Sequence, residues 1–271
     1  MKLKEVGEKV LIETARKTFG RGKPIRVGIG DDAAAIDLPG KKCLVVTTDM
    51  LVASTHFPAG MKPEQMGKKS VIVNLSDLAS MGAKPLGLVF SVALPRELEL
   101  ELVNRIMQGM ESAAREYETY VVGGDLDEAE EITIAGSAFG LADKNKLLKR
   151  SGARKGDLLA VTGDLGAASA GLKIIMEKIP VQGYEELVMA QLEPRARVKE
   201  GMALARSGLV KAAIDVSDGL ATNLWHLSRE SDVKIIVDRE KIPVHSLVKK
   251  FSEQYGYDID EFALYSGEDF E

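Results

Sequence analysis

The sequence lacks a second cysteine, an excess of basic residues and any long hydrophobic run. Cys43 is the only cysteine among 271 residues, so no disulfide can form within the chain, and its apolar surroundings predict a small buried side chain. A net charge of −5, with acids and bases interspersed, argues against a nucleic-acid partner. No apolar run has the length of a membrane span or the form of a signal-peptide core, so we expect a cytoplasmic protein without a membrane partner.

The spacing of apolar residues predicts alternating helices and strands, which is typical of an α/β or α+β protein. In the first half, the expected helices cover residues 4–18, 63–81 and 97–118, and the expected strands cover residues 86–95, 119–125 and 132–142. In the second half, we expect a strand–loop–helix unit over 157–177, helices over 194–208 and up to Trp225, and a strand over 233–238. A polar, basic stretch at 142–156 separates the halves, and we place the domains at 1–145 and 146–271.

Acidic residues directly follow apolar segments at five places in the sequence. They are Asp31 with Asp32, Asp49, Asp77, Asp125, and Asp215 with Asp218. Any one of them fits a helix cap or a turn, but a carboxylate attached to a buried segment is costly to bury alone. Because the ends of core elements share a rim, we expect these groups to converge, and converging carboxylates require cations between them. Oxygen ligands without a Cys cluster or an H-E-x-x-H motif favour magnesium, which in turn favours a nucleotide substrate.

The stretch RVGIGDDAAA, residues 26–35, has the G-x-G-x-x-A spacing of a dinucleotide-binding loop. Two adjacent aspartates, Asp31 and Asp32, occupy this loop, and their charge opposes a phosphate bound directly on the loop amides. We therefore interpret the loop as a sharp turn that brings Asp32 to a magnesium ion, with Asp31 as a cap or a second ligand. The sequence GMKPEQMGKKS does not match a P-loop. Gly163 and Gly166 fit a phosphate-binding loop and a tight strand-to-helix turn equally well.

Seven motifs follow one another between Gly28 and Glu271. They are GIGDDAA, TTDMLVASTHF, NLSDLASMGAKP, GGD, KRSGARKGDLLAVTGDLG, AAIDVSDGLATNL and SGEDFE. Together they closely resemble the thiamine-monophosphate kinases, which are related to aminoimidazole-ribonucleotide synthetase, selenophosphate synthetase and a hydrogenase-maturation dehydratase. The resemblance implies a two-domain α/β fold, in which the N-terminal domains of two chains form a β-barrel and a C-terminal domain covers it. It also implies a homodimer that uses ATP and several Mg²⁺ ions to convert thiamine monophosphate to thiamine diphosphate.

The resemblance also assigns site residues, motif by motif. The metal ligands would be Asp32, Thr47, Thr48, Asp49, Asp77, Asp125, Asp215 and Asp218. ATP would meet Gly124, Asp125, Arg150 and Ser217, and thiamine monophosphate would meet His56 and Glu268. Taken alone, His56 is more often a structural histidine, and Arg150 is more often a surface charge. The acceptor is a phosphate monoester that is already largely ionised at neutral pH, so we expect direct in-line transfer without a general base or a phosphoenzyme.

Two alternative functions stay open at this stage. One is another ATP-dependent synthetase of the same superfamily, although the chain lacks the reactive cysteines that two of those enzymes use. The other is a catalytically silent ATP-binding homologue. Family members usually continue beyond SGEDFE with elements that complete the second domain and the thiamine pocket, and two explanations of the end at Glu271 compete. Either the chain is shortened, or it is a natural short form with an open pocket.

Overall fold

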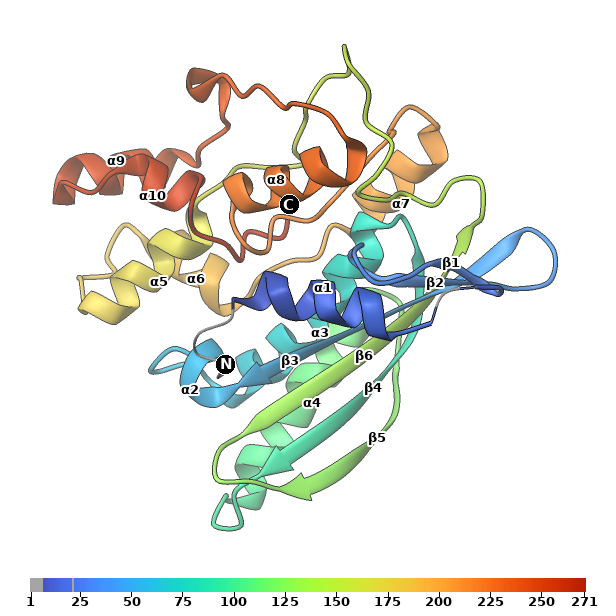
Figure 1. Ribbon diagram of the computed structural model, residues 1–271. Coiled ribbons are helices and arrows are strands. Elements are labelled where there is room, and N and C mark those ends of the chain that lie inside the picture. Colours follow the sequence, from blue (N-terminus) through green and yellow to red (C-terminus); the bar gives the residue numbers. More distant parts are fainter. Residues whose placement is uncertain (1–6, 21) are drawn as a thin grey trace.

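A six-stranded mixed sheet occupies the first half of the chain in the computed structural model, which describes residues 7–20 and 22–271 (Figure 1). Its strands are β1 (Ile25–Val27), β2 (Ala34–Asp37), β3 (Lys42–Val52), β4 (Lys84–Leu94), β5 (Val121–Glu128) and β6 (Thr133–Asp143). They lie in the order β1-β2-β3-β6-β4-β5. The β4–β5 pair is parallel, and the other neighbouring pairs are antiparallel. Helix α4 (Leu100–Glu116) provides the crossover that the parallel pair requires.

Helices α3 (Pro63–Ser80) and α4 pack together on one face of this sheet (Figure 1). The two helices touch at backbone distance, since a Cβ on Gly67 would lie 2.0 Å from the carbonyl oxygen of Ile106. Helix α3 also contacts helices of the second half of the chain. Its central stretch, residues 70–76, has no charged side chain, and a helix without a polar face is buried all round. As a result, Asp77, near the end of α3, lies in the interior of the molecule.

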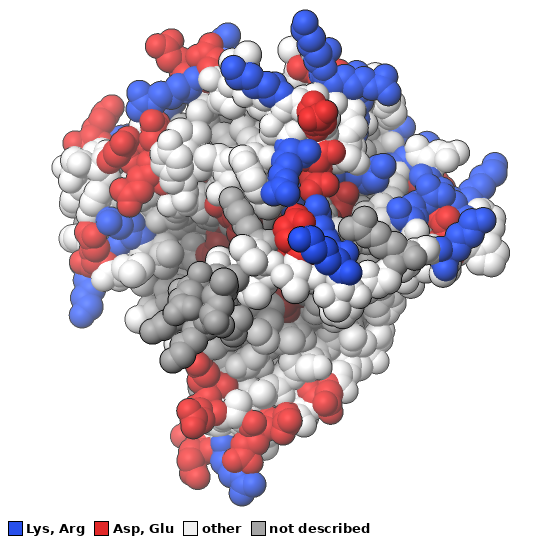
Figure 2. All heavy atoms as spheres, viewed as in Figure 1, with Lys and Arg blue, Asp and Glu red and all other residues white. Residues whose placement is uncertain are grey.

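The opposite face of the sheet is exposed and largely apolar. Side chains alternate along a strand, so the neighbours of buried residues point away from α3 and α4. Met50, Val89, Val122 and Leu126 are exposed by 59%, 37%, 59% and 64%. Figure 1 looks onto this face, and Figure 2 shows an uncharged surface over the sheet with acidic side chains gathered at its lower end. A contiguous exposed apolar face is typical of a protein–protein interface.

The second half of the chain is mainly helical. It contains α5 (Ala167–Glu177), α6 (Glu185–Leu192), α7 (Val198–Ser207), α8 (Leu220–Ser231), the 3-10 helix η2 (Arg239–Lys241), α9 (Ser246–Tyr255) and α10 (Ile259–Ala263). A separate apolar core joins α5, α6, α9 and α10 through residues such as Leu187, Phe251 and Phe262. This half lies beside α3, on the side away from the lower end of the sheet (Figure 1).

The strands predicted within 157–177 and over 233–238 are wrong, because among the described residues neither segment joins a ladder of hydrogen bonds. Val161 and Ile235 pack against a small core cluster, whereas Leu158 and Ile236 are 96% and 83% exposed. A strand needs a neighbouring strand to pair its backbone groups, and an apolar sequence alone does not supply one. The chain is therefore α/β as a whole, but within the described residues its second half contributes helices and one isolated parallel bridge, between Leu165 and Val244, and no sheet of its own.

Most other elements expected from the sequence are confirmed. The helices at 63–81 and 97–118 correspond to α3 and α4, those at 194–208 and up to Trp225 correspond to α7 and α8, and the three first-half strands correspond to β4, β5 and β6. The helix expected at 4–18 corresponds to α1 (Glu8–Thr18), and its expected start lies outside the described residues. Cys43 is buried, as predicted. Within residues 7–20 and 22–271, no helix is both long and apolar enough to cross a membrane.

The segment SGEDFE, residues 266–271, runs through the middle of the molecule, where Figure 1 marks the C-terminal end beside α8. The Phe270 side chain is buried in a cluster with Leu51 and Val73 of the first half. The Phe270 amide donates to the carbonyl oxygen of Val216 in the second half, at 3.0 Å. This segment therefore joins the two halves of the chain.

Candidate active site

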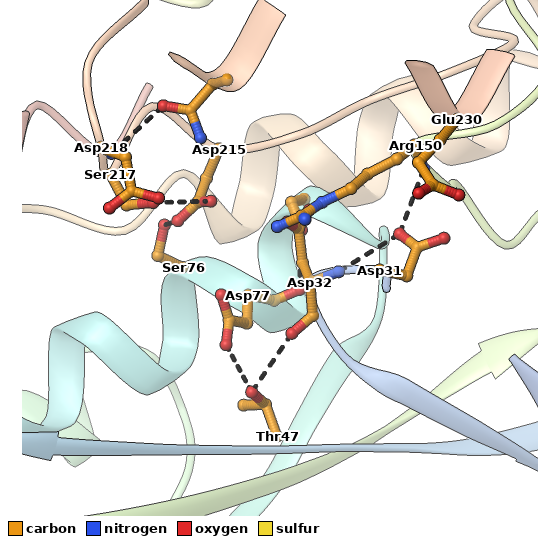
Figure 3. Close-up of polar contacts among 12 residues, drawn as sticks. Asp31, Asp32, Thr47, Ser76, Asp77, Arg150, Asp215, Ser217, Asp218 and Glu230 are labelled. Carbon is orange, nitrogen blue, oxygen red and sulfur yellow. Dashed lines mark hydrogen bonds and ion pairs between the residues drawn. The ribbon is translucent and has the colours of Figure 1, made fainter. Parts of the chain in front are cut away.

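Three carboxylates from distant parts of the sequence meet between the two halves of the chain (Figure 3). Asp32 precedes β2, Asp77 lies near the end of α3, and Asp215 lies in the loop before α8. Each offers one carboxylate oxygen, and these oxygens all lie within 4.8 Å of one another. The structure thus brings together three of the acids that were expected to converge.

Hydroxyl groups hold two of these carboxylates in place. Thr47 on β3 donates to Asp77, and its Oγ1 lies 3.4 Å from the backbone oxygen of Asp32. Ser76 on α3 donates to Asp215, with an Oγ–Oδ2 distance of 2.6 Å. These bonds connect the sheet, α3 and the loop before α8, so the cluster forms part of the contact between the two halves (Figure 3).

Burial and mutual repulsion raise the pKa values of the clustered acids. Burial, followed by the charge of Asp32, raises the pKa of Asp215 to about 7. Burial, followed by the charges of Asp215 and Asp49, raises the pKa of Asp77 well above its usual range. Carboxylates in this situation hold their negative charge at a cost unless a cation lies among them.

One oxygen of the cluster lacks a partner among the described residues. Oδ2 of Asp32 is buried without a hydrogen bond of normal geometry, although the Ser80 hydroxyl lies near this carboxylate, and the Asp32 side chain is only 1% exposed. An unpartnered buried carboxylate oxygen is costly, and a bound metal ion would satisfy it. The donor atoms around it are carboxylate and hydroxyl oxygens, which suit a hard divalent cation such as Mg²⁺ better than Zn²⁺. The residues present therefore fit a magnesium site.

The two aspartates of the glycine-containing loop have different tasks. Arg150 binds Asp32 through its guanidinium, with a distance of 2.8 Å from Nε to Oδ1. The Asp31 carboxylate accepts hydrogen bonds from the backbone N–H groups of Arg150, at 3.1 Å, and of Asp32, at 3.2 Å. Gly30, with φ at +118°, allows the turn between strand and carboxylates. Asp31 therefore fixes the backbone, and Asp32 faces the cluster (Figure 3).

Strand β3 supplies further acids and hydroxyls, but its two faces differ. Thr47 and Asp49 share the face toward α3 because side chains alternate along a strand. Burial and then the charge of Asp218 raise the pKa of Asp49, so Asp218 lies near enough for its charge to act on Asp49. Thr48 lies on the opposite face, where its Oγ1 donates to the carbonyl oxygen of Gly136 at 2.8 Å. The structure therefore brings the Thr47 side chain to the cluster and not that of Thr48.

Gly124 and Asp125 lie on β5, three strands away from β3 in the sheet. At about 4.8 Å per strand, this separation is roughly 14 Å, so neither residue reaches the carboxylate cluster directly. A Cβ on Gly124 would lie 2.1 Å from the carbonyl oxygen of Phe90 on β4. The close approach of two strands is therefore one sufficient reason for glycine at this position. Ser217, by contrast, lies next to the cluster, with its Oγ 3.5 Å from Oδ1 of Asp215.

His56 and Glu268 meet at a buried lysine that the sequence analysis missed. The Nζ atom of Lys69 on α3 lies 2.7 Å from Oε1 of Glu268 and 3.2 Å from the backbone oxygen of His56. Lys69 precedes the uncharged stretch 70–76, and that stretch indicates a helix buried on all sides. This pattern could have marked Lys69 as a buried cation that requires acidic partners.

At the turn of Gly163 and Gly166, a side chain of the protein itself stands where one interpretation of the sequence placed a phosphate. The Asp269 carboxylate accepts hydrogen bonds from the backbone N–H groups of Gly166, at 2.8 Å, and of Ala168, at 3.3 Å. It therefore caps the start of α5. Burial raises the pKa of Asp269 to about 6. An anion of the protein itself therefore occupies the helix N-terminus, which confirms the tight-turn interpretation and contradicts the phosphate-loop one.

Two family models match most of the chain. The AIR synthase related protein N-terminal domain matches residues 30–142, and the AIR synthase related protein C-terminal domain matches residues 154–262.

Individual proteins are similar over nearly the full chain. The thiamine-monophosphate kinase of Pyrococcus abyssi is 41% identical over 248 residues, which cover 91% of this chain and 76% of that protein. The thiamine-monophosphate kinase of Aquifex aeolicus is 37% identical over 273 residues, covering 100% of this chain and 86% of that protein. A solved structure of AaThiL complexed with AMPPCP and TMP superimposes with a TM-score of 0.92 at 36% identity, covering 100% of this chain and 85% of that one.

Proposed function

This chain belongs to the thiamine-monophosphate kinase family, and we propose that it transfers the γ-phosphoryl group of ATP to thiamine monophosphate, giving ADP and thiamine diphosphate. The observation that most supports this proposal is the buried cluster of Asp32, Asp77 and Asp215 with its unpartnered oxygen. Reactions between two phosphate-bearing substrates need such a site, because repulsion between the anions must be offset. The similar chain complexed with AMPPCP, an ATP analogue, and TMP supports both substrates.

We assign the metal to Asp32, Asp77 and Asp215 first, with Thr47, Asp49 and Asp218 beside them. Bound there, Mg²⁺ would neutralise and orient the phosphate oxygens of both substrates. The terminal oxygen of a phosphate monoester is already largely ionised at neutral pH, so the residues need only position it in line with the γ-phosphorus. We therefore propose direct transfer without a phosphoenzyme.

We assign the ATP side of the site to Arg150 and Ser217, with Gly124 and Asp125 as more distant contacts on β5. Arg150 uses two of its nitrogens on Asp32, and its planar fork has further donors for a phosphate. Ser217 lies beside Asp215, where its hydroxyl is free to turn from that carboxylate to a ligand. A specific loss of ATP affinity in Asp125→Asn would support the assignment of β5, and unchanged kinetics would remove it.

We assign the acceptor side to His56 and Glu268. The His56 ring is held through Nδ1, which lies 3.0 Å from the backbone nitrogen of Val52, 2.7 Å from Oγ1 of Thr55 and 3.2 Å from the backbone oxygen of Val52. The other ring nitrogen, Nε2, would meet a phosphate oxygen of thiamine monophosphate. Glu268 lines a cavity of about 300 Å³, together with Gln191, Met176 and Phe262, and it would accept a hydrogen bond from the thiamine portion.

We also propose that a second copy of the chain covers the exposed sheet face. Met50, Val89, Val122 and Leu126 form an apolar surface that the described helices leave open. A symmetric pairing of two such faces would bury each of them against its equivalent. This arrangement agrees with the barrel expected from the resemblance.

The test of the proposed function uses the full chain, Mg²⁺-ATP and thiamine monophosphate, with chromatographic detection of thiamine diphosphate. Formation of thiamine diphosphate in step with ADP supports the proposal. Binding of ATP without product favours the silent homologue, and ADP formation that depends on another acceptor favours a different member of the superfamily. Trapping a radiolabelled protein from labelled ATP would contradict direct transfer.

A further inference from the structure

A cation is enclosed near the middle of α3, away from the carboxylate cluster. The Lys69 side chain is only 1% exposed, and its ammonium has two described oxygen partners, Oε1 of Glu268 at 2.7 Å and the backbone oxygen of His56 at 3.2 Å. A buried ammonium is costly unless it is paired and hydrogen-bonded. These two oxygens therefore hold the Lys69 ammonium in place. The ammonium in turn holds the Glu268 carboxylate close to the backbone of His56.

Glu268 is held from several directions. Its second carboxylate oxygen accepts from Nε2 of Gln191 at 2.5 Å, and its backbone N–H donates to the carbonyl oxygen of Ser217 at 2.9 Å. Its φ angle is +71°, a left-handed conformation that is unfavourable for glutamate. Such a conformation persists only where the surroundings enforce it, and here Lys69, Gln191 and Ser217 are those surroundings.

The contacts of Glu268 with Lys69, Gln191 and Ser217 leave its carboxylate able to accept a hydrogen bond from a ligand. An ionised carboxylate has about four acceptor positions, and Lys69 and Gln191 use one on each oxygen. The Glu268 side chain is 28% exposed and lines the cavity of about 300 Å³ described above. The remaining acceptor positions can therefore meet a donor in that cavity without any loss of the two existing bonds.

Lys69 also connects the two halves of the chain. His56 follows β3 in the first half, and Glu268 belongs to the SGEDFE segment at the end of the second half. We propose that Lys69 is a positioning residue for the acceptor substrate, because its ammonium sets the Glu268 carboxylate at a fixed place relative to His56. This inference rests on the proposed function, in which His56 and Glu268 bind thiamine monophosphate. Lys69 itself touches neither the carboxylate cluster nor the proposed ATP residues. Its removal should therefore raise KM for thiamine monophosphate more than KM for ATP.

The test compares Lys69→Met with Lys68→Met in the full chain. Lys68 is the neighbouring residue on α3, and its ammonium forms partly exposed ion pairs with Glu193 at 3.3 Å and Glu116 at 3.6 Å. Loss of a charge-assisted positioning contact predicts that Lys69→Met raises KM for thiamine monophosphate roughly ten- to hundredfold, while KM for Mg²⁺-ATP stays within about twofold. Lys68→Met is expected to leave both KM values within about twofold of the wild type.

Two further variants distinguish positioning from general destabilisation. Lys69→Arg keeps a cation and is expected to recover part of the lost acceptor affinity. Gln191→Leu removes the hydrogen bond to the other carboxylate oxygen of Glu268, so it is also expected to raise KM for thiamine monophosphate. If Lys69→Met does not fold, this variant still tests whether the fixed position of Glu268 matters for the acceptor. An equal rise of both KM values, or no rise for thiamine monophosphate in either variant, overturns the proposal. Absence of product from the wild-type chain would instead overturn the proposed function.

Discussion

Arg150 neutralises only one side of Asp32: its Nε lies 2.8 Å from Oδ1, while Oδ2 is buried and has no hydrogen-bond partner among the described residues. The protein therefore supplies one cation to this carboxylate, and the other oxygen is the one that the proposed metal ion would meet. The proposed metal site and the proposed ATP site thus share a single side chain, and changes to Arg150 should affect both.

Replacing Arg150 with methionine should lower the stability of the metal-free protein and should also lower its affinity for ATP. The Asp32 carboxylate would lose its counter-charge in a nearly inaccessible position, which typically costs about 3 kcal/mol. We expect a lower Tm in EDTA, partial recovery in Mg²⁺, and a higher KM for ATP. Thermal unfolding with and without Mg²⁺, together with steady-state kinetics, checks this. Arg154→Met is the matched control, since Arg154 is exposed, and a similar loss there would refute the assigned role of Arg150.

Asp77→Asn should abolish phosphoryl transfer while leaving the protein folded. The substitution removes a charge that Asp215 and Asp49 repel, so the Tm in EDTA should stay the same or rise. Loss of a metal ligand should reduce kcat by about a thousandfold or more. Asp143→Asn, at an exposed ion pair with Lys42, serves as control. Normal turnover of the Asp77 variant would remove this residue from the metal site.

Stability without Mg²⁺ should fall as the pH rises from about 4 to about 7. The folded-state pKa is about 6 for Asp31 and about 7 for Asp215, above the ordinary 3.8, so at these two positions the folded chain binds more protons than the unfolded chain within this window. A pKa that differs by one between the folded and unfolded chain corresponds to about 1.4 kcal/mol of stability, so a loss of several degrees in Tm is expected.

Added Mg²⁺ should reverse this loss, and the gain should be larger at pH 8 than at pH 5, where protons compete for the carboxylates. Melting curves at both pH values, with EDTA or Mg²⁺, measure the difference. An equal gain at the two pH values would place the ion elsewhere.

Charging the exposed sheet face should change the oligomeric state. Leu126 is 64% exposed on this face, so Leu126→Asp costs the single chain little but would bury a charge in a dimer interface. We expect a shift from dimer to monomer in sedimentation equilibrium. Leu100→Asp is the control, because Leu100 is 74% exposed on α4, away from this face. A wild-type monomer, or a Leu126 variant that still dimerises, would contradict the proposed interface.

The first half of the fold followed from local patterns in the sequence. Helix α3 begins at Pro63 and ends before Gly82, as these residues predict, and Asp32, Asp77 and Asp215 stand at the ends of apolar segments that converge in the structure. Strand alternation also separates Thr47 from Thr48, so the sequence could have distinguished these two candidate ligands.

The remaining features depend on contacts between residues that are distant in sequence. Leu158 and Ile236 have the apolar character of strands, but strand formation requires a partner that a local pattern cannot reveal. Asp269 caps α5 from more than a hundred residues away, which no local rule for helix N-termini anticipates. The Lys69–Glu268 pair likewise joins a lysine outside the seven motifs to the SGEDFE motif, about two hundred residues further along the chain.

The burial of Phe270 among Leu51 and Val73 limits how the protein can move. Swinging the two halves apart about a hinge would withdraw this ring from the first-half core, at a cost of about 2–3 kcal/mol for the exposed aromatic surface alone. An open form would therefore be populated to only about one per cent. Substrate entry and product release should depend mainly on side chains and loops that move while Phe270 stays in place, with brief opening of the two halves as a rare event.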